Sequence, residues 1–500
     1  MAQSLTVKAL GLFALAALIF SQESLAQIHI AASDVGAVRL SHPGAFAYEI
    51  GACVEGIGDI DGDGFKEIAI GAPSFDPGGD LGLETRNGAV FVVSGKMLQH
   101  EKTSIDLSEP GLIAWSIIGR QESQIGSVIA ALGDINGDGF DDFAFSSPLK
   151  SDSYVMFGGE VIPRLFALND FENYGIHIRN SGASFSSAGD FNGDGYYDAA
   201  LGRPLDPKSP EAPGRLTLLY GASSFPHEID ALNLPSIVGL PNTRLGDCIV
   251  GGFDLKADGY SDLLISEPDW GQQKQGRAFI LEGAGSLQQD FAEGLQSPLM
   301  IEPVGGYVRT IHDVNGDGLI DFLFGATTQE AWIVLGRPHF EGLVNRQFLE
   351  NDPQSIRLVG DATYYGIHDV NGDGFADIAA AMPNATVNGK ALVGQVMFLF
   401  GKTEWPKEVN ISAISDSNTN QLDYLLIDGL EEFGVFGSSV AGVKDVQGDG
   451  FDDVIIGAPA IRDPSGLNKD RPGSAYVIQG RNIYFITQTE RSQFFTRNSD

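Results

Sequence analysis

The sequence predicts an all-β fold, organised as a closed ring of seven repeats with four short strands each. Three observations predict it. Short runs of β-branched and aromatic residues alternate with Gly, Pro, Asn and Asp, and Gly alone accounts for 64 of the 500 residues, which is typical of many short strands joined by turns. One acidic nine-residue motif recurs seven times along the chain. Each copy of the motif stands among apolar runs of strand length.

The acidic motif has the form Asp-x-Asn/Asp-x-Asp-Gly-x-x-Asp/Glu, with departures at its third position in two copies. The first aspartates of successive copies are separated by 75, 56, 64, 59, 56 and 76 residues. Recurrence at such a spacing indicates a structural repeat rather than chance similarity. The copies occupy residues 59–67, 134–142, 190–198, 254–262, 313–321, 369–377 and 445–453.

Each repeat contains apolar runs at corresponding places. One run leads into the motif, as in 127–132, and a second follows it at once, as in 454–456. A third run ends in Gly, as in 89–95, and a weaker fourth run precedes the next copy, as in 356–358. Four strands in each of seven repeats predict a seven-bladed β-propeller of four-stranded antiparallel blades. Because no blade buries both of its faces alone, the blades are expected to share one continuous core.

The ring must close by bringing the two ends of the chain together in one blade. The segment Val38-Arg39-Leu40 resembles the fourth-strand segment Ile356-Arg357-Leu358, so we expect it to supply the outer strand of the last blade. The segment 482–486 is the alternative for that place. The propeller is thus expected to span residues 27–487, followed by a polar tail over 488–500.

The first 26 residues are expected to be a secretory signal peptide. Lys8 precedes an apolar run over residues 9–20, and Ser24-Leu25-Ala26 fits a small-x-small cleavage site. The run is shorter than the roughly 20 residues that a spanning helix needs, so we expect no transmembrane segment in the mature chain. This predicts a secreted or cell-surface protein, or a periplasmic one in a bacterium.

The composition limits the classes of partner. A formal charge of −35 argues against nucleic acid and anionic membranes, both of which repel an acidic surface. The same acidity fits a protein whose carboxylates meet cations.

The spacing within the motif predicts calcium-binding hairpin loops. Positions 1, 3 and 5 place oxygen side chains inside a tight turn, Gly at position 6 permits the turn, position 7 offers its carbonyl, and the acid at position 9 closes the cage. An EF-hand is excluded, because it needs Glu at position 12 between helices, whereas position 12 is apolar in all seven copies, as at Ile70 and Phe145.

Six of the seven loops carry a usable set of calcium ligands, and about six Ca²⁺ ions are expected. In the fourth loop Lys256 occupies position 3, where an ammonium repels the ion, so we expect Lys256 to pair with Asp254, Asp258 or Asp262 and to leave that loop empty. The predicted ligands are Asp59, Asp61, Asp63, Phe65 and Glu67; Asp134, Asn136, Asp138, Phe140 and Asp142; Asp190, Asn192, Asp194, Tyr196 and Asp198; Asp313, Asn315, Asp317, Leu319 and Asp321; Asp369, Asn371, Asp373, Phe375 and Asp377; and Asp445, Gln447, Asp449, Phe451 and Asp453.

The repeat resembles the FG-GAP repeat of integrin α-subunit propellers over roughly residues 38–480. A Gly stands eight positions before the first loop Asp in six repeats, as at Gly51, Gly126 and Gly437, whereas the sixth repeat has Asp361 there. The resemblance implies that each loop joins the first two strands of a blade and holds Ca²⁺ at one rim. No integrin leg domains follow, so a free-standing propeller is expected. In integrins a β subunit shares in ligand binding, and this sequence identifies no such partner.

Other residues suggest no catalytic site. Cys53 and Cys248 lie at equivalent positions of nearly opposite repeats, too far apart for a disulfide, so we expect buried free thiols. His312 and His368 each precede a loop and are expected to be strand residues facing solvent or the next blade. Asn384 begins a glycosylation sequon.

We therefore expect no enzyme, but an extracellular adhesion or recognition module for a protein or glycan ligand. The alternatives are a lectin, marked by aromatics repeated at one blade position, and a propeller-type polysaccharide lyase or phospholipase, marked by an acid–base cluster in the central channel. A purely structural component of an envelope or matrix is the remaining alternative.

Overall fold

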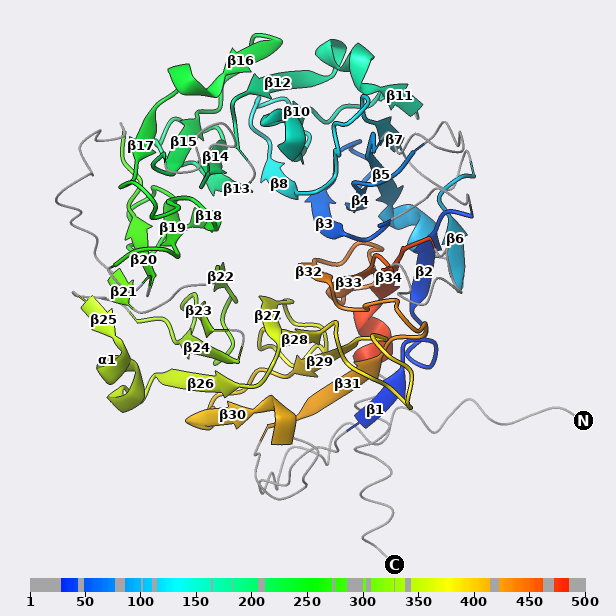
Figure 1. The fold of residues 1–500 in the computed structure, drawn as a ribbon, viewed down its shortest axis with the longest axis vertical. Helices are drawn as coiled ribbons and strands as arrows, with labels where there is room; N and C mark the ends of the chain where they lie inside the picture. The colour runs from blue at the N-terminus through cyan, green and yellow to red at the C-terminus, as the bar shows by residue number, and fades with distance from the viewer. Residues whose placement is uncertain are drawn as a thin grey trace, which may run out of the picture.

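The computed structural model confirms the predicted architecture. Seven small antiparallel sheets stand around a central axis as the blades of a β-propeller (Figure 1). We number the blades by the acidic loop that each carries. The structure describes residues 28–43, 49–76, 86–99, 102–109, 115–162, 165–182, 184–205, 212–271, 274, 276–285, 300–302, 307–327, 329–337, 343–413, 422–461 and 472–484. The predicted signal peptide and the predicted tail over 488–500 lie outside these residues.

Each blade contains four antiparallel strands, named in order from the axis outwards. Blades one to three consist of β3 (Cys53–Gly58), β4 (Glu67–Ala72), β5 (Ala89–Ser94) and β7 (Trp115–Ile118); β8 (Ile129–Gly133), β9 (Asp142–Ser147), β10 (Asp152–Met156) and β12 (Gly175–Arg179); and β13 (Ser184–Gly189), β14 (Asp198–Arg203), β15 (Arg215–Leu219) and β17 (Ser236–Val238). Blades four and five consist of β18 (Ile249–Phe253), β19 (Asp262–Glu267), β20 (Arg277–Leu281) and β21 (Met300–Glu302); and β22 (Tyr307–Thr310), β23 (Phe322–Thr327), β24 (Glu330–Val334) and β26 (Ser355–Val359). Blades six and seven consist of β27 (Thr363–Gly366), β28 (Ile378–Met382), β29 (Gln395–Leu399) and β31 (Tyr424–Asp428); and β32 (Ser439–Val443), β33 (Asp453–Ala458), β34 (Ser474–Ile478) and β2 (Val38–Ser41).

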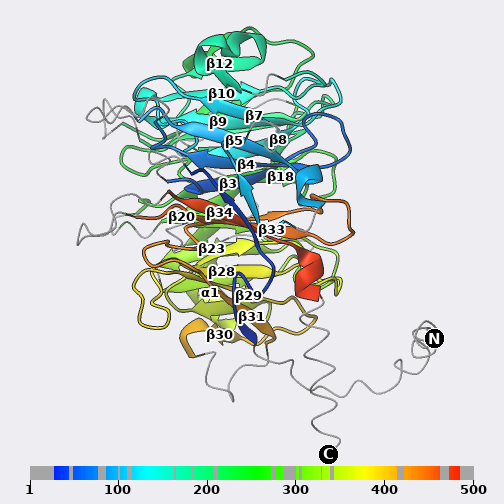
Figure 2. The same ribbon diagram turned by 90° about the vertical axis from the view of Figure 1, so that its right-hand side faces the viewer.

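The N-terminal part of the chain closes the ring, as predicted. Strand β2 pairs antiparallel with β34, with Val38 opposite Val477 and Leu40 opposite Ala475. The alternative segment is wrong for its described part, because residues 482–484 lie in a helical turn. Strand β1 (Ile28–Ala31) also pairs in parallel with β31 of blade six. Figure 2 shows this dark blue segment running across the last two blades, so the closure holds two blades rather than one.

A fifth, outer strand was not predicted. In six sheets a short parallel strand from the segment of the next blade in the ring extends the outer edge, whereas the described residues of blade three form four strands. Besides β1, these strands are β6 (Ser104–Asp106), β11 (Leu165–Ala167), β16 (Glu228–Asp230), β25 (Leu343–Asn345) and β30 (Glu408–Asn410). They link adjacent blades at the rim. Helix α1 (Arg346–Asn351) follows β25, and the 3₁₀ turn η5 (Ile411–Ala413) follows β30.

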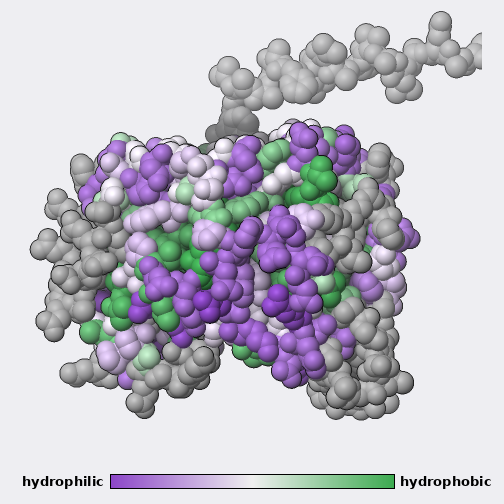
Figure 3. Space-filling view, turned by 90° about the horizontal axis from the view of Figure 1, so that it is seen from above, coloured by the Kyte–Doolittle hydropathy of each residue, from purple (hydrophilic) through white to green (hydrophobic). Residues whose placement is uncertain are grey.

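The core runs between blades rather than within them. Every residue of β4, β9, β19 and β33, the second strands of their blades, is buried. One hydrophobic cluster joins Ile68 and Phe91 of blade one to Val443 and Ile455 of blade seven, as expected for sheets that bury their faces only against each other. On the side of the ring that Figure 3 shows, hydrophilic surface is interrupted by smaller hydrophobic areas. Among the described residues, no helix is long and apolar enough to cross a membrane.

Candidate metal centres

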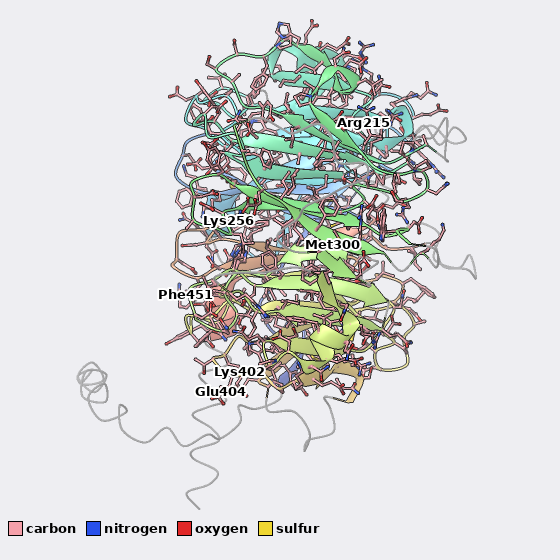
Figure 4. All side chains as sticks on the ribbon, turned by 90° about the vertical axis from the view of Figure 1, so that its left-hand side faces the viewer. Arg215, Lys256, Met300, Lys402, Glu404 and Phe451 are labelled. Atoms are coloured by element: carbon pink, nitrogen blue, oxygen red, sulfur yellow. The ribbon has the colours of Figure 1, made fainter. Side chains whose placement is uncertain are left out.

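All seven acidic loops lie where the repeat predicts, between the first and second strands of their blades. The strand that leads into each loop runs along the central axis, and the next strand starts at position 9 in five blades and at position 10 in blades five and six. The loops therefore gather on one face of the ring. In Figure 4, Lys256 of the fourth loop and Phe451 of the seventh lie at the same edge of the ring, while Arg215 lies towards the opposite edge. We call these two sides the loop face and the opposite face.

The first aspartate organises each loop by accepting backbone hydrogen bonds. In the second loop, Asp134 Oδ1 accepts from Gly137 N at 2.6 Å, and its Oδ2 accepts from Gly139 N at 2.8 Å. Gly139 has a φ of 94°, a conformation that favours glycine. The bond from position 6 recurs in every loop, at Asp59, Asp190, Asp254, Asp313, Asp369 and Asp445.

Positions 3 and 5 are held by each other. Asn136 Nδ2 donates to Asp138 Oδ2 at 2.8 Å, and the backbone N–H of Asp138 donates to Asn136 Oδ1 at 2.9 Å. Phe140 N then donates to Asp138 Oδ1 at 3.0 Å. The amide-to-carboxylate bond recurs at Asn192, Asn315, Asn371 and Gln447. The oxygens at positions 1, 3 and 5 thus lie in one turn, as the ligand spacing requires.

The acid at position 9 has a second role that the motif alone did not reveal. Asp142 is fully buried and accepts Ile135 N at 2.9 Å and Gly158 N at 2.8 Å. Gly158 is the glycine that ends the third apolar run, so one carboxylate ties the loop to that run. The same bond from the third-run glycine reaches Asp198, Asp262, Asp321, Asp377 and Asp453.

Burial raises the free energy needed to ionise these carboxyl groups. Removal from water is the main cause that raises the pKa of Asp142 to about 8, and the nearby Asp138 and Asp134 raise it further. The same causes raise the pKa of Asp321 to about 7 and hold that of Asp377 well above its usual range. A divalent cation in the loop would offset both the burial and the repulsion.

The first loop gives the strongest indication of a metal site. Asp59, Asp61 and Glu67 bring one carboxylate oxygen each to within 4.8 Å of one another, and within the described ranges they form the only such group. Glu67 is fully buried, and its Oε1 has no hydrogen-bond partner in the described structure. The longer Glu side chain explains this, since Gly95 N donates instead to the Lys66 carbonyl. An unpaired buried oxygen beside two carboxylates fits a bound cation.

In the seventh loop, a predicted calcium ligand is already hydrogen-bonded to another side chain. Gln447 is buried, and its Oε1 accepts from Gln479 Nε2 at 2.6 Å. Its own Nε2 donates to Asp449 Oδ2 at 2.9 Å. The amide oxygen predicted as a ligand is therefore already used by a neighbouring side chain, and a cation would have to compete with Gln479.

The fourth loop corrects one prediction. Lys256 does not pair with Asp254, Asp258 or Asp262; its Nζ forms an ion pair with Glu282, just beyond β20. The side chain is long enough to reach across the loop to the third strand. The loop still adopts the common fold, with Gly259 N donating to Asp254 Oδ2 and Leu255 N to Asp262 Oδ2, both at 2.8 Å. The loop conformation therefore does not depend on a complete set of ligands.

A contact between neighbouring loops was also missed. The position-7 ring of one loop covers the position-4 glycine of the preceding loop. A Cβ added to Gly137 would lie 2.5 Å from the Tyr196 ring, and one added to Gly316 would lie 2.6 Å from the Phe375 ring. The fourth loop instead carries Ala257, and the next loop carries Leu319 at position 7. A flat ring over position 4 needs glycine there. Where the glycine is replaced by Ala257, the ring is also replaced, by Leu319.

The cysteines and the two loop histidines can also be compared with their predictions. Cys53 and Cys248 are free, as expected, but both are half-buried rather than buried. His312 and His368 lie just after their strands rather than within them, and their rings stack on each other at 4.1 Å across the boundary of blades five and six. The expected contact with the next blade is thus present. The prediction that both histidines are strand residues is wrong, because each has a left-handed backbone conformation with a φ of 59°.

The fold and the loops define a repeat propeller with acidic hairpin loops on one face, and known proteins share these features. The FG-GAP repeat family model matches residues 56–93 and 436–478, which include the first and seventh loops. Integrin alpha-PS2 of Drosophila melanogaster is 27% identical over 225 residues, which cover 42% of this chain and 14% of that protein. Integrin alpha-V of Gallus gallus is 27% identical over 210 residues, which cover 39% of this chain and 19% of that protein.

A longer match is found with a different kind of protein. Phosphatidylinositol-glycan-specific phospholipase D of Bos taurus is 23% identical over 437 residues, covering 85% of this chain and 45% of that protein. The chain thus spans less than half the length of each of these relatives. The matches and the ring of seven blades show FG-GAP repeats in this chain and a propeller similar to that of integrin α subunits.

Proposed function

We propose that this chain is a secreted, calcium-binding recognition module that binds an extracellular protein or glycan and catalyses no reaction. The observation that carries the proposal is the first loop, where the buried, unpaired Glu67 oxygen lies beside Asp59 and Asp61. Burial raises the pKa of Glu67 to about 8, and a bound cation would favour the ionised form that burial and the neighbouring carboxylates disfavour. The integrin-like relatives support an extracellular role.

In this proposal the loops hold Ca²⁺ through positions 1, 3, 5 and 9 and the position-7 carbonyl of every loop except the fourth. A cation held in this way would be bound both by the turn and by the buried position-9 acid near the start of the second strand. The protein's own residues pre-form the turn through the backbone hydrogen bonds to position 1. Six ions would offset about 12 of the 35 negative charges.

Ligand binding is assigned to surfaces away from the loops. Calcium stiffens the loop face, while the opposite face and the two longest inter-loop segments, before Asp134 and before Asp445, carry the variable surface. A rigid scaffold that displays variable loops is the usual arrangement of a binding protein. A partner subunit is not required by this proposal.

A binding screen tests the proposed function. Residues 27–500 are screened against matrix proteins and glycans with calcium and with a chelator, and bound ions are counted by native mass spectrometry. Saturable, calcium-dependent binding supports the recognition module. If no ligand binds in either condition while the ions are present, the recognition function is wrong and calcium is a stabiliser alone.

A second candidate function follows from the longest match. The similarity to phosphatidylinositol-glycan-specific phospholipase D extends over 85% of this chain, further than either integrin match. The candidate is that this chain hydrolyses, or helps to hydrolyse, a phosphatidylinositol-glycan. Release of a glycan-anchored reporter protein from vesicles by the purified chain would favour this candidate, and the absence of release would favour the non-catalytic module.

A further inference from the structure

The opposite face contains a pocket between blades five and six that the recognition proposal does not assign. It is an open pocket of about 550 Å³, lined by Tyr307 at the start of β22, Asp361 and Thr363 before and at the start of β27, Met382 at the end of β28, Asn384 after it, and Ser412 in η5. This volume lies within the roughly 300–1,000 Å³ of small-molecule sites.

The pocket lies where the repeat pattern breaks. In three repeats the glycine eight positions before the loop donates its N–H to the end of the second strand, from Gly51 to Gly71, from Gly246 to Ser266 and from Gly437 to Gly457. Gly126 and Gly182 of the second and third repeats lack this bond in the described structure, and so does Asp361, the equivalent residue of the sixth repeat. The departure at the sixth repeat is therefore the side chain itself.

The side chain at this position explains the opening. The repeat glycines approach the preceding blade closely; a Cβ added to Gly126 would lie 2.5 Å from the Ala89 carbonyl oxygen. An aspartate cannot occupy that space. The chain instead turns at Gly360, which has a φ of 140°, and Ala362 N donates back to the Gly360 carbonyl at 3.0 Å. Asp361, Ala362 and Thr363, which follow this turn, line the pocket between the blades.

The polar groups around the pocket are free to bind a ligand. Among the described residues, the side chains of Asp361, Thr363, Asn384 and Ser412 have no hydrogen-bond or ion-pair partner, whereas the Tyr307 hydroxyl accepts from Tyr364 N at 3.3 Å. The unpaired groups include carboxylate, amide and hydroxyl, which together both donate and accept.

The charge of the lining selects the chemical class. Asp361 is the one ionisable acid among the lining residues, and no Lys or Arg joins it. Phosphate, sulfate and acidic glycans are therefore repelled. A simple ammonium group offers only donors and would leave the amide N–H of Asn384 unused. A neutral sugar offers hydroxyls that donate and accept, and apolar C–H faces that fit Met382, Pro383 and the neighbouring alanines.

We infer that this pocket binds a neutral hexose unit of a glycan, with Asp361 and Asn384 as the principal contacts to its hydroxyls. The inference deepens the proposed recognition function and rests on it, by naming one ligand class and one site. It assigns to Asp361 a binding role in place of the structural role of the glycine in the other repeats.

The test uses the full chain, secreted by a bacterial host so that the Asn384 sequon stays unmodified, in the presence of calcium. Methyl glycosides of mannose, galactose, glucose and N-acetylglucosamine are compared with methylamine and with inorganic phosphate by saturation-transfer NMR and calorimetry. The matched variants are Asp361→Gly, which restores the residue of the other repeats, and Glu109→Gln, which changes an exposed acid outside the pocket.

At least one glycoside is expected to bind saturably, and Asp361→Gly to weaken it by about tenfold or more while Glu109→Gln leaves it unchanged. Because glycine is native to this position in the other repeats, Asp361→Gly is expected to fold, which its melting temperature verifies. Binding of methylamine alone, no glycoside binding up to about 10 mM, or equal binding by Asp361→Gly would overturn the inference. Retained calcium and a matrix-protein ligand bound elsewhere would then leave the proposed function standing.

Discussion

The first and fourth loops share one backbone fold but differ in what they can hold. In both, Gly at position 6 donates to the first aspartate, and position 9 accepts from position 2. The first loop brings three carboxylates together around an unpaired buried oxygen, whereas the fourth places Lys256 at position 3 and pairs it with Glu282. The hydrogen bonds of positions 1, 6 and 9 are thus common to both loops, and we expect the residue at position 3 to decide whether a cation binds.

Removal of calcium is expected to have the largest effect. A chelator should lower the melting temperature by about 10 °C or more, because each ion at 100 times its Kd contributes about 2.7 kcal/mol and several loops act together. Differential scanning calorimetry with and without calcium measures this. An unchanged melt in excess chelator would mean that the loops are acidic turns without ions.

Alanine at position 9 should separate an occupied loop from the empty one. Asp377 and Asp262 each accept two backbone N–H groups, so both substitutions should cost about 2–4 kcal/mol in chelator. Only Asp377→Ala should lose a further calcium-dependent stability of about 2–3 kcal/mol and one bound ion. Urea unfolding in chelator and in calcium measures the two losses of stability. If calcium stabilised the two variants equally, the sixth loop would not differ from the fourth in holding an ion.

Restoring position 3 should convert the fourth loop. Lys256→Asn supplies an amide oxygen and removes the repelling ammonium, so one additional ion should bind, with a gain of about 1–3 kcal/mol in calcium. Lys150→Asn, an exposed lysine outside the loops, is the control and should gain no ion. If Lys256→Asn binds no more calcium than the control, position 3 does not decide occupancy.

The pH dependence of the calcium-free protein should reveal the buried acids. Burial raises the pKa of Asp142 to about 8, of Asp321 to about 7 and of Asp198 to about 6, from an ordinary value of 3.8. A raised folded-state pKa gives stability that is complete below the unfolded pKa and is lost as the pH rises through the folded pKa.

In chelator the free energy of unfolding should therefore fall between about pH 4 and about pH 8. Calcium, which favours the ionised carboxylates, should flatten this slope. Urea titrations at several pH values with each additive provide the measurement. The same slope in both conditions would show that the position-9 acids do not face the ions.

The contact between neighbouring loops should contribute least. Phe140 covers Gly62 of the preceding loop, where an added Cβ would lie 2.6 Å from its ring. Phe140→Ala should cost about 1–2 kcal/mol, since the ring is only partly buried. Leu319→Ala, at the pair that lacks both glycine and ring, should cost less. A larger loss for Leu319→Ala would contradict the assigned role of the ring.

Most of the fold could be predicted from the sequence repeat, because each blade has the same alternation of apolar runs and turns. The closing strand could be recognised since Val38-Arg39-Leu40 repeats the pattern of another fourth strand. The outer parallel strands could not be recognised, because three residues, as in β11 and β16, are too few to show a period. They exist only where blade packing places them beside an edge.

The candidate site was predictable in its residues but not in its partners. The motif spacing placed the acidic residues in seven turns, six of them with predicted ligands. The ion pair of Lys256 with Glu282 and the bond from Gln479 to Gln447 instead join segments that only the blade brings together. Asp361 could be recognised in the sequence as a departure from the repeat. The pocket beside it could not, because it depends on the packing between blades five and six. Local pattern gives the loops, and the packing between strands and blades gives their neighbours.

Counting bound calcium tests the central claim most directly. Native mass spectrometry of residues 27–500 titrated with calcium should show about six ions at saturation, with one more in Lys256→Asn and one fewer in Asp377→Ala. No bound calcium, or a count that neither substitution changes, would contradict the claim that position 3 and the buried position-9 acid decide which loops hold a cation.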